Sequence, residues 1–391
     1  MPKICHVIFE HHPLDGRVFY KEAVSHAQMG YQVFLLAPAR DNRSIGRKRE
    51  ISRQPTTPFI YHDVEFRTYR YSKWIPRQFG LRQWFTRRRM IKMMEEIDAE
   101  VYHFHEDQVV LEACLQFIMR RPAKKIVFDF HECFLVSYLE KRKNPSEIGR
   151  YLLQEQQLIR RADLIITVSE TLTRHFRLLG AETVCTVLNC QSRAIFKQIP
   201  QSSVTDDTFW VCHEGRMLFD RGLKLILEIA RRLTNPRIKI LLIGSMPARE
   251  QRYFEEQQSL HHLSENIRLT GWQAYEQVSS FLSISKIGLF FMSSRNGRLG
   301  IANKFFNYLC FGLPIIALKC ETTDEIIQRY ECGLIFKPDQ SAEIAAQIDA
   351  LAQDSDHYQR LADNSRRAFE ERYNWEIMAE RLQQAYREML S

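Results

Sequence analysis

The stretch Phe209–Leu223, with the sequence FWVCHEGRMLFDRGL, combines a strand, a glycine-containing loop and the start of a helix. Its apolar run ends near His213, a glycine follows at position 215, and an apolar segment with helical periodicity begins at Leu223. A short buried strand that turns through glycine into a helix is the opening unit of a doubly wound α/β domain. We therefore expect such a domain to begin here.

Apolar strands and helical segments alternate on both sides of this stretch. In the second half we expect strands at Phe209–His213, Ile238–Ile243, Ile267–Leu269, Ile287–Phe291, Ile315–Leu318 and Leu334–Phe336, and helices at Leu223–Leu233, Val278–Ser283, Asn303–Phe311 and Ala342–Gln353. In the first half we expect strands at Ile4–Phe9, Gln32–Ala37, Val101–Phe104, Lys125–Phe130, Leu164–Val168 and Val184–Leu188, and helices at Gly16–Met29, Val109–Met119, Ile148–Arg160 and Glu170–Leu179. This pattern is typical of parallel sheets covered on both faces.

The predicted fold class is therefore α/β, with two Rossmann-like doubly wound domains. A chain of 391 residues is too long for one ordinary core. The polar, non-periodic stretch Gln198–Thr208 predicts a linker between an N-terminal domain over residues 1–198 and a C-terminal domain over residues 209–370. Two such domains that face each other form a cleft at the carboxyl ends of their strands, where ligands bind.

The composition is that of a folded globular protein, because hydrophobic residues make up 45% of the chain. No apolar run approaches the roughly 20 residues that span a bilayer, and the first residues do not resemble a signal peptide. We therefore expect a cytoplasmic protein. The nine cysteines include no C-x-x-C pair, which predicts buried free thiols rather than disulfides or a zinc site.

Positive charge is concentrated in one segment. Residues 40–92 contain 15 Lys/Arg and 4 Asp/Glu, whereas the rest of the chain contains 40 and 43. Within residues 67–92 the cations are interleaved with aromatic residues, a combination that suits an anionic membrane surface. A basic groove that stacks nucleic-acid bases, or a solvated face that also supplies core aromatics, has a similar composition. We favour a peripheral position at the inner face of the plasma membrane and expect no nucleic-acid partner.

The ordered motifs of the chain resemble those of the retaining GT-B glycosyltransferases of family 4, group 1. The matching segments are Gly215-Arg216, Arg221-Gly222, Ile243-Gly244, Thr270-Gly271-Trp272, Asn303–Phe306 and Gly312–Ala317, and, more weakly, Asp15–Arg17, Asp129–Glu132, Ala162-Asp163 and Thr167–Ser169. The resemblance implies a hexosyl- or related transferase whose C-terminal domain binds the nucleotide-sugar and whose N-terminal domain binds the acceptor. It also implies that a final helix within residues 371–391 crosses back to the N-terminal domain.

Arg216 and Arg221 are the expected catalytic cations of this enzyme. Two fixed positive charges at the start of a helix stabilise a nucleotide diphosphate as it leaves. The other expected donor-binding residues are Gly215, Gly244, Gly300, Asn303, Lys304 and Asn307. No aspartate pair suggests a metal-held diphosphate, so we expect no cofactor beside the donor substrate.

The chain departs from the family pattern at two positions. Two glutamates eight positions apart are usual there, and this chain has Leu299 and Asn307 in their places. Asn307 can still accept one hydrogen bond and donate another, and the lost charge assistance should weaken nucleotide binding by on the order of 1 kcal/mol. The departure leaves open a non-catalytic GT-B relic that binds a partner. A second alternative is a nucleotide-sugar epimerase or hydrolase, which would need no acceptor site and no membrane patch.

His131, directly after the strand Lys125–Phe130, is the third expected catalytic residue. The resemblance places it over the donor sugar, where a neutral imidazole bonds a sugar hydroxyl. We expect Glu132, Asp15 and Arg17 to bind the acceptor, although Asp15 also suits the plain role of capping the following helix. With the basic stretch, these residues predict a lipid-linked or envelope-polysaccharide acceptor.

His103 and His105 lie two positions apart and hence on one face of their strand. Such a pair suggests a metal site, but no third ligand is evident from the sequence. We therefore expect no bound metal.

Overall fold

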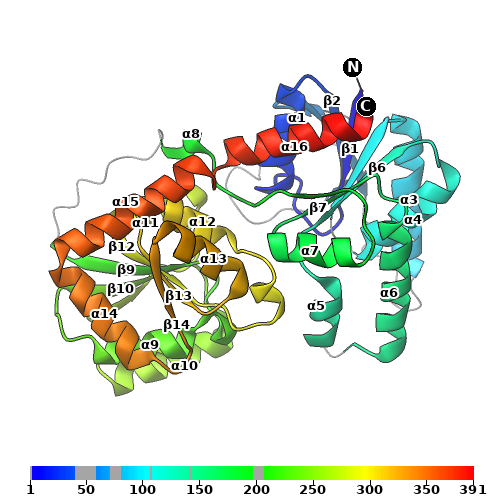
Figure 1. The fold of residues 1–391 in the computed structure, drawn as a ribbon. Helices are drawn as coiled ribbons and strands as arrows, with labels where there is room; N and C mark the ends of the chain where they lie inside the picture. Colours follow the sequence, from blue (N-terminus) through cyan, green and yellow to red (C-terminus); the bar gives the residue numbers. More distant parts are fainter. Residues whose placement is uncertain (1, 40–58, 71–80, 106–107, 141–142, 197–206) are drawn as a thin grey trace. The chain divides into compact units, whose positions relative to one another are not determined.

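The computed structural model describes residues 2–39, 59–70, 81–105, 108–140, 143–196 and 207–391. The chain forms two compact units, unit 1 (Met1–Val187 with Ala379–Ser391) and unit 2 (Leu188–Met378). Each unit contains one sheet flanked by helices, which confirms the predicted α/β class (Figure 1). Most of the expected linker lies in residues 197–206, outside the described residues. Among the described helices, none combines the length and the apolar character needed to cross a membrane.

The sheet of unit 1 has the strand order β3-β4-β2-β1-β5-β6-β7-β8, and all neighbours are parallel except β3 and β4. Its strands are β1 (Lys3–Val7), β2 (Gln32–Ala39), β3 (Phe59–Tyr61), β4 (Val64–Arg70), β5 (Val101–His105), β6 (Lys125–Phe130), β7 (Leu164–Thr167) and β8 (Val184–Thr186). Its helices are η1 (Val18–Ala23, a π-helix), α1 (Val24–Gln28), α3 (Leu81–Ile97), α4 (Gln108–Arg120), α5 (Phe134–Glu140), α6 (Pro145–Ile159) and α7 (Glu170–Leu178).

Both faces of this sheet are covered, as the apolar runs predicted. In β2, Phe34 and Leu36 join the core cluster that contains side chains of α3, α4 and α6. The alternate residues Val33 and Leu35 join a second cluster with Val18 of η1. Successive strand residues point to opposite faces, so β2 lies between two hydrophobic layers.

Part of the basic stretch lies inside this unit, which the sequence analysis did not foresee. Tyr69 of β4 is buried, Arg67 pairs with Glu65 at 2.5 Å, and Arg87 of α3 contacts Glu112 of α4. Residues 71–80 of the stretch lie outside the described residues. The sequence analysis did not predict β4 and α3, because arginines lie next to their buried residues in the sequence and obscure the apolar pattern. Only the start of α3 retains an exposed combination of cationic and aromatic side chains among the described residues of this stretch.

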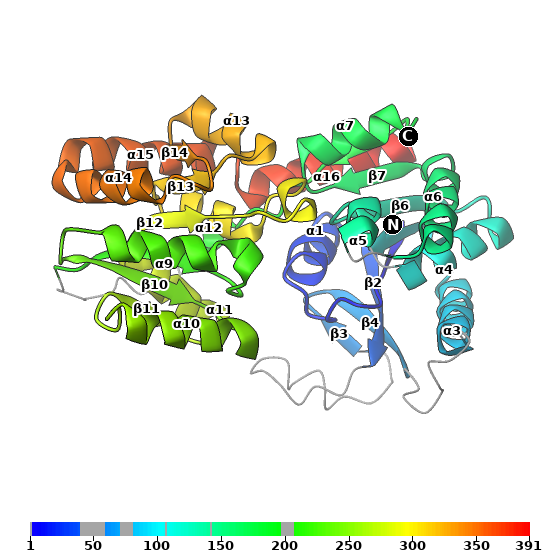
Figure 2. The same cartoon turned by 90° about the horizontal axis from the view of Figure 1, so that it is seen from below.

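The sheet of unit 2 is fully parallel, with the order β11-β10-β9-β12-β13-β14. Its strands are β9 (Phe209–Glu214), β10 (Ile238–Ile243), β11 (Ile267–Leu269), β12 (Ser285–Phe290), β13 (Ile315–Leu318) and β14 (Gly333–Phe336). Its helices include α9 (Leu223–Arg232), α10 (Ala248–Leu260), α11 (Tyr275–Ile284), α12 (Asn303–Cys310), α13 (Glu321–Tyr330), α14 (Ser341–Gln353) and α15 (Ser355–Glu371). Helices α9 and α14 pack against each other and share one core cluster with the sheet (Figure 2).

The last helix, α16 (Trp375–Leu390), contributes residues to both units, because the group Ala379–Ser391 belongs to unit 1. Its Tyr386 is fully buried and lies 2.8 Å from Nδ1 of His103. The C-terminal residues are therefore part of the polar interior of unit 1.

Candidate active site

The loop after β9 contains the two arginines that were predicted to bind the diphosphate. Arg216 is exposed, while Arg221 is half-buried and donates from Nη1 to the carbonyl oxygen of Arg216 at 3.3 Å. Gly215 and Gly222 have φ angles of 100° and 86°, which favour glycine. At position 222 a Cβ atom would lie 2.6 Å from Cβ of Phe291. The glycines therefore allow one short loop to present both cations between β9 and α9.

Gly244, which follows β10, packs directly against that loop. Its φ is 143°, and a Cβ atom there would lie 2.3 Å from the carbonyl oxygen of Gly215. Any side chain at position 244 would displace the loop that carries Arg216. Gly300 lies in the loop before α12, where its carbonyl oxygen accepts a hydrogen bond from Thr322 at 3.5 Å. Gly244 therefore leaves room for the backbone of Gly215, and the contact found for Gly300 is a hydrogen bond within the loop before α12.

A carboxylate that the sequence analysis overlooked lies at the end of β9. Glu214 accepts hydrogen bonds from Nδ2 of the buried Asn307 through both oxygens, at 2.8 and 2.7 Å. Burial raises the pKa of Glu214, and the hydrogen bond from Asn307 opposes that shift. Asn307 occupies the position where the family pattern has a glutamate. A carboxyl group, that of Glu214, therefore contacts the side chain that stands in place of that glutamate.

The start of α12 adds a third cation to this region. Helix α12 begins at Asn303, which is exposed, and Nζ of the buried Lys304 lies 2.6 Å from Nε2 of His213. Burial, together with the positive charge of Arg221, lowers the pKa of Lys304 to about 7. Burial and the neighbouring Lys304 hold the pKa of His213 well below its usual value, so His213 is the neutral acceptor of this pair. Lys304 is thus poised to change charge near neutral pH.

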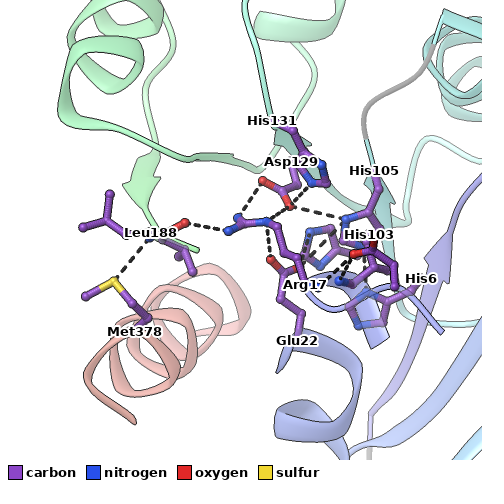
Figure 3. Close-up of polar contacts among 12 residues, drawn as sticks. His6, Arg17, Glu22, His103, His105, Asp129, His131, Leu188 and Met378 are labelled. Carbon is purple, nitrogen blue, oxygen red and sulfur yellow. Dashed lines mark hydrogen bonds and ion pairs between the residues drawn. The ribbon is translucent and has the colours of Figure 1, made fainter. Parts of the chain in front are cut away.

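In unit 1, His131 follows β6 and is held by Asp129 at the end of that strand (Figure 3). Its Nε2 lies 2.7 Å from Oδ2 of Asp129, and its side chain is 17% exposed. Burial lowers the pKa of His131, and the carboxylate of Asp129 opposes this shift. A neutral ring that donates from Nε2 to Asp129 leaves Nδ1 free to accept a hydrogen bond. Asp129 is the orienting partner that the sequence analysis did not single out.

Arg17 was predicted to bind the acceptor, but its guanidinium is engaged inside the protein. The side chain is 3% exposed, binds both carboxylate oxygens of Asp129 at 2.9 and 3.0 Å, and donates to the carbonyl oxygen of Val187 at 2.8 Å. A buried ion pair of this kind positions other groups rather than meeting a ligand. We therefore treat Arg17 as a positioning residue for Asp129 and His131.

The other two predicted acceptor residues, Asp15 and Glu132, are neighbours in sequence of Arg17 and His131. Asp15 caps the following helical turn, since its Oδ1 accepts from the backbone amides of Arg17 at 2.8 Å and Val18 at 3.0 Å. Burial opposes ionisation of Asp15, but its contact with His11 and these amides outweigh burial and hold its pKa below the usual value. Glu132 is half-buried beside His131.

Comparisons with known proteins identify the family that the chain resembles. A family model described as "Glycosyltransferase Family 4" matches residues 16–190, and one described as "Glycosyl transferases group 1" matches residues 195–368. The chain is similar to an alpha-D-kanosaminyltransferase from Streptomyces kanamyceticus, with 24% identity over 186 residues, 47% of each chain. The match therefore spans about half the length of that curated relative.

Similar folds occur in solved structures that cover nearly the whole chain. Sucrose-phosphate synthase from Thermosynechococcus elongatus superposes with a TM-score of 0.79 at 15% identity, covering 100% of this chain and 99% of that one. HepE from Anabaena, in complex with UDP and glucose, has a TM-score of 0.73 at 14% identity, covering 99% and 100%. With both halves matched in order by the two family models, the chain belongs to the family 4, group 1 glycosyltransferases of the GT-B fold.

Proposed function

We propose that this chain transfers a sugar from a nucleotide-sugar to an acceptor, with retention at the anomeric carbon. The observation that carries the proposal is the charged group of unit 2. Arg216 and Arg221 belong to one loop, in which Nη1 of Arg221 donates to the carbonyl oxygen of Arg216 at 3.3 Å. Burial and, after it, the positive charge of Arg221 lower the pKa of Lys304 at the start of α12. Among the described residues, no carboxylate forms an ion pair with these three side chains, and such a concentration of positive charge suits a diphosphate.

In the proposed transfer, the bond between the anomeric carbon and the diphosphate oxygen breaks, and the acceptor hydroxyl forms a new bond to that carbon. The proton of the hydroxyl passes to the departing diphosphate. Negative charge grows on the departing diphosphate. Cations that are already in place stabilise this charge without reorganisation, which lowers the barrier more than it strengthens ground-state binding. We assign this role to Arg216 and Arg221, with the ammonium form of Lys304 beside them.

In the proposed nucleotide site, the carboxylate of Glu214 is the hydrogen-bond acceptor for the ribose hydroxyls. An ionised carboxylate accepts two hydroxyl hydrogen bonds, and such charge-assisted bonds are about twice as strong as neutral ones. Asn307 fixes the orientation of this carboxylate from α12. The pair Glu214–Asn307 thus replaces the single glutamate of the family pattern.

His131 is our candidate for contact with the sugar, and Glu132 for contact with the acceptor. Asp129 holds the imidazole in one tautomer, and Nδ1 is then an acceptor for a sugar hydroxyl. An Asp–His pair oriented in this way needs no metal to bind a hydroxyl.

The start of α3 supports a lipid-linked acceptor for this enzyme. Leu81, Trp84 and Phe85 are exposed there, and the guanidinium of Arg88 lies 4.6 Å from the centre of the Trp84 ring. Exposed aromatic and cationic side chains on one helix suit the boundary of an anionic membrane. Flotation with liposomes containing anionic lipid tests this: we expect salt-sensitive binding that Trp84→Ala and Phe85→Ala weaken, and equal flotation of the wild type and the variants would contradict it.

A donor screen tests the proposed function. Calorimetry against UDP-, GDP-, ADP- and dTDP-sugars should identify one nucleotide that binds the wild type, with binding weakened in Arg221→Ala and retained in Arg360→Ala, an exposed arginine of α15. Binding without transfer to any acceptor fraction would support the non-catalytic relic that Leu299 favours. Release of free sugar without acceptor would support a hydrolase. Absence of nucleotide binding would overturn the proposal.

A further inference from the structure

A second polar cluster lies beneath the Arg17–Asp129 pair in unit 1 (Figure 3). It consists of His6 on β1, Glu22 on η1, and His103 and His105 on β5, and all four residues have an exposed fraction of 0%. Burying polar groups is costly unless each finds a partner. The proposed transfer does not use this cluster, so its presence needs another explanation.

A chain of hydrogen bonds fixes the outer nitrogens of the cluster. Nε2 of His105 lies 2.9 Å from Nδ1 of His6, and Nε2 of His6 lies 3.0 Å from Nδ1 of His26. Nδ1 of His103 lies 2.8 Å from the hydroxyl of Tyr386. Both ring nitrogens of His6 are therefore occupied, whereas His103 and His105 each use one nitrogen for these bonds.

The remaining atoms of three residues converge without hydrogen bonds. Nε2 of His103 and Nδ1 of His105 are buried and lack hydrogen-bond partners, and they lie 3.7 and 3.8 Å from Oε2 of Glu22. Nδ1 of His105 also lies 3.3 Å from Oδ2 of Asp129. A shared proton would draw a nitrogen and an oxygen to about 2.7–3.2 Å. Tetrahedral ligands at zinc-type bond lengths lie about 3.4 Å apart. The two separations from Oε2 of Glu22 exceed hydrogen-bond contact, and the three atoms lie within 4.8 Å of one another, which leaves room for an ion between them.

One guanidinium, that of Arg17, faces the two acidic side chains of this interior. Its Nε lies 2.9 Å from Oε1 of Glu22 and 2.9 Å from Oδ2 of Asp129. Oε2 of Glu22 has no hydrogen-bond partner. A buried polar atom left without a partner is unfavourable, and a bound ion would satisfy it.

We propose that Glu22 Oε2, His103 Nε2 and His105 Nδ1 bind one divalent transition-metal ion of the Zn²⁺ class. Two imidazoles and one carboxylate are ligands that such ions prefer. Tyr386 and His6 accept hydrogen bonds from the far nitrogens of the two ligand imidazoles, the arrangement that orients metal-binding histidines. The ion ties η1 to β5 next to Arg17, which contacts both Glu22 and Asp129. This structural role is distinct from the transfer itself.

The experiment uses the full-length, tag-free protein. After dialysis against a chelator and then against Zn²⁺ or Co²⁺, elemental analysis should find close to one equivalent of metal per chain. The Co²⁺ form should show the intense visible absorption of a low-symmetry site with nitrogen ligands. His105→Asn and Glu22→Gln should each lose the metal, while His175→Gln, a histidine of α7 outside the cluster, should retain it.

Two results would overturn the proposal. The first is a folded wild-type protein that retains well under one equivalent of either metal and shows no Co²⁺ spectrum. The second is bound metal whose spectrum and stoichiometry are unchanged in His105→Asn and Glu22→Gln. The wild-type spectrum needs no variant, so a variant that fails to fold does not obscure the answer. Because metal content is the readout, failure here is distinguishable from failure of the proposed transfer.

Discussion

The two units place their arginines in opposite environments. In unit 1, Arg17 is 3% exposed and bound to Asp129, with Glu22 on its other side. In unit 2, Arg216 is exposed, and Arg221 donates a hydrogen bond to a backbone carbonyl rather than to a carboxylate. A guanidinium that is paired inside the protein holds its neighbours in place, whereas one without a carboxylate partner remains available to an anionic ligand. Environment, more than residue type, therefore separates the positioning arginine from the candidate catalytic ones.

Removing each arginine in turn gives the largest expected contrast. Arg17→Ala leaves Asp129 as an uncompensated buried charge, and breaking a buried pair in this way costs about 3–5 kcal/mol of stability. Arg216→Ala removes an exposed side chain and should change stability by less than about 0.5 kcal/mol. Urea unfolding of the full chain, followed by circular dichroism, measures both. Equal stabilities of the two variants would show that Arg17 does not have the structural role assigned to it.

The rate of sugar transfer should depend strongly on the two arginines of unit 2 and not on an exposed control arginine. Loss of one preorganised cation at a developing negative charge lowers kcat by about 100- to 1000-fold. We expect this of Arg216→Ala and Arg221→Ala, in protein with wild-type circular dichroism, and no change in Arg360→Ala. Initial rates of sugar transfer with the donor found by calorimetry provide the measurement. Full activity of folded Arg216→Ala would remove that residue from the mechanism.

The sequence predicted the sheets of both units because their strands are short, apolar and nearly continuous. The strands Lys125–Phe130, Ile238–Ile243, Ile267–Leu269 and Ile315–Leu318 have the predicted bounds. Strand β4 was missed because its arginines resemble a solvated surface, although Phe66 and Tyr69 are buried. Prediction from periodicity depends on the spacing of apolar side chains. It misses a strand or helix in which charged residues form ion pairs within the protein.

The site was less predictable than the fold, because its contacts join residues far apart in the chain. Glu214 and Asn307 are on different elements, and no local pattern shows that they touch. Likewise, His103 and His105 offered no evident third ligand in the sequence, and no bound metal was expected. Glu22, the third residue of the proposed metal site, belongs to η1 and approaches the two histidines of β5 only in the folded unit. A charged residue at the end of a buried strand, as in Cys212-His213-Glu214, was the available signal for Glu214.

Each unit holds one of these acidic side chains with a different partner. Asp129 in unit 1 is paired with Arg17, whereas Glu214 in unit 2 is hydrogen-bonded to the amide of Asn307. Replacing Glu214 with glutamine removes the charge and keeps the shape, which should weaken nucleotide binding about tenfold. Asn307→Ala should weaken it less. If Asn307 acts only by orienting Glu214, the double variant should bind no more weakly than Glu214→Gln alone. Calorimetry on the three variants tests this, and additive losses would show that Asn307 contacts the nucleotide independently.

Lys304 should give the smallest effect, visible as a dependence of affinity on pH. Its pKa is about 7 in the ligand-free protein. A bound diphosphate favours the ammonium form and therefore raises this pKa, so binding takes up protons above pH 7. Affinity should be greatest near pH 7 and fall several-fold toward pH 9. Lys304→Met, which cannot titrate, should bind more weakly at pH 7 and show a flatter profile. Calorimetry in two buffers with different ionisation enthalpies measures the proton uptake directly. If wild type and Lys304→Met take up the same number of protons, the diphosphate does not interact with this lysine, and the cationic group of unit 2 consists of the two loop arginines alone.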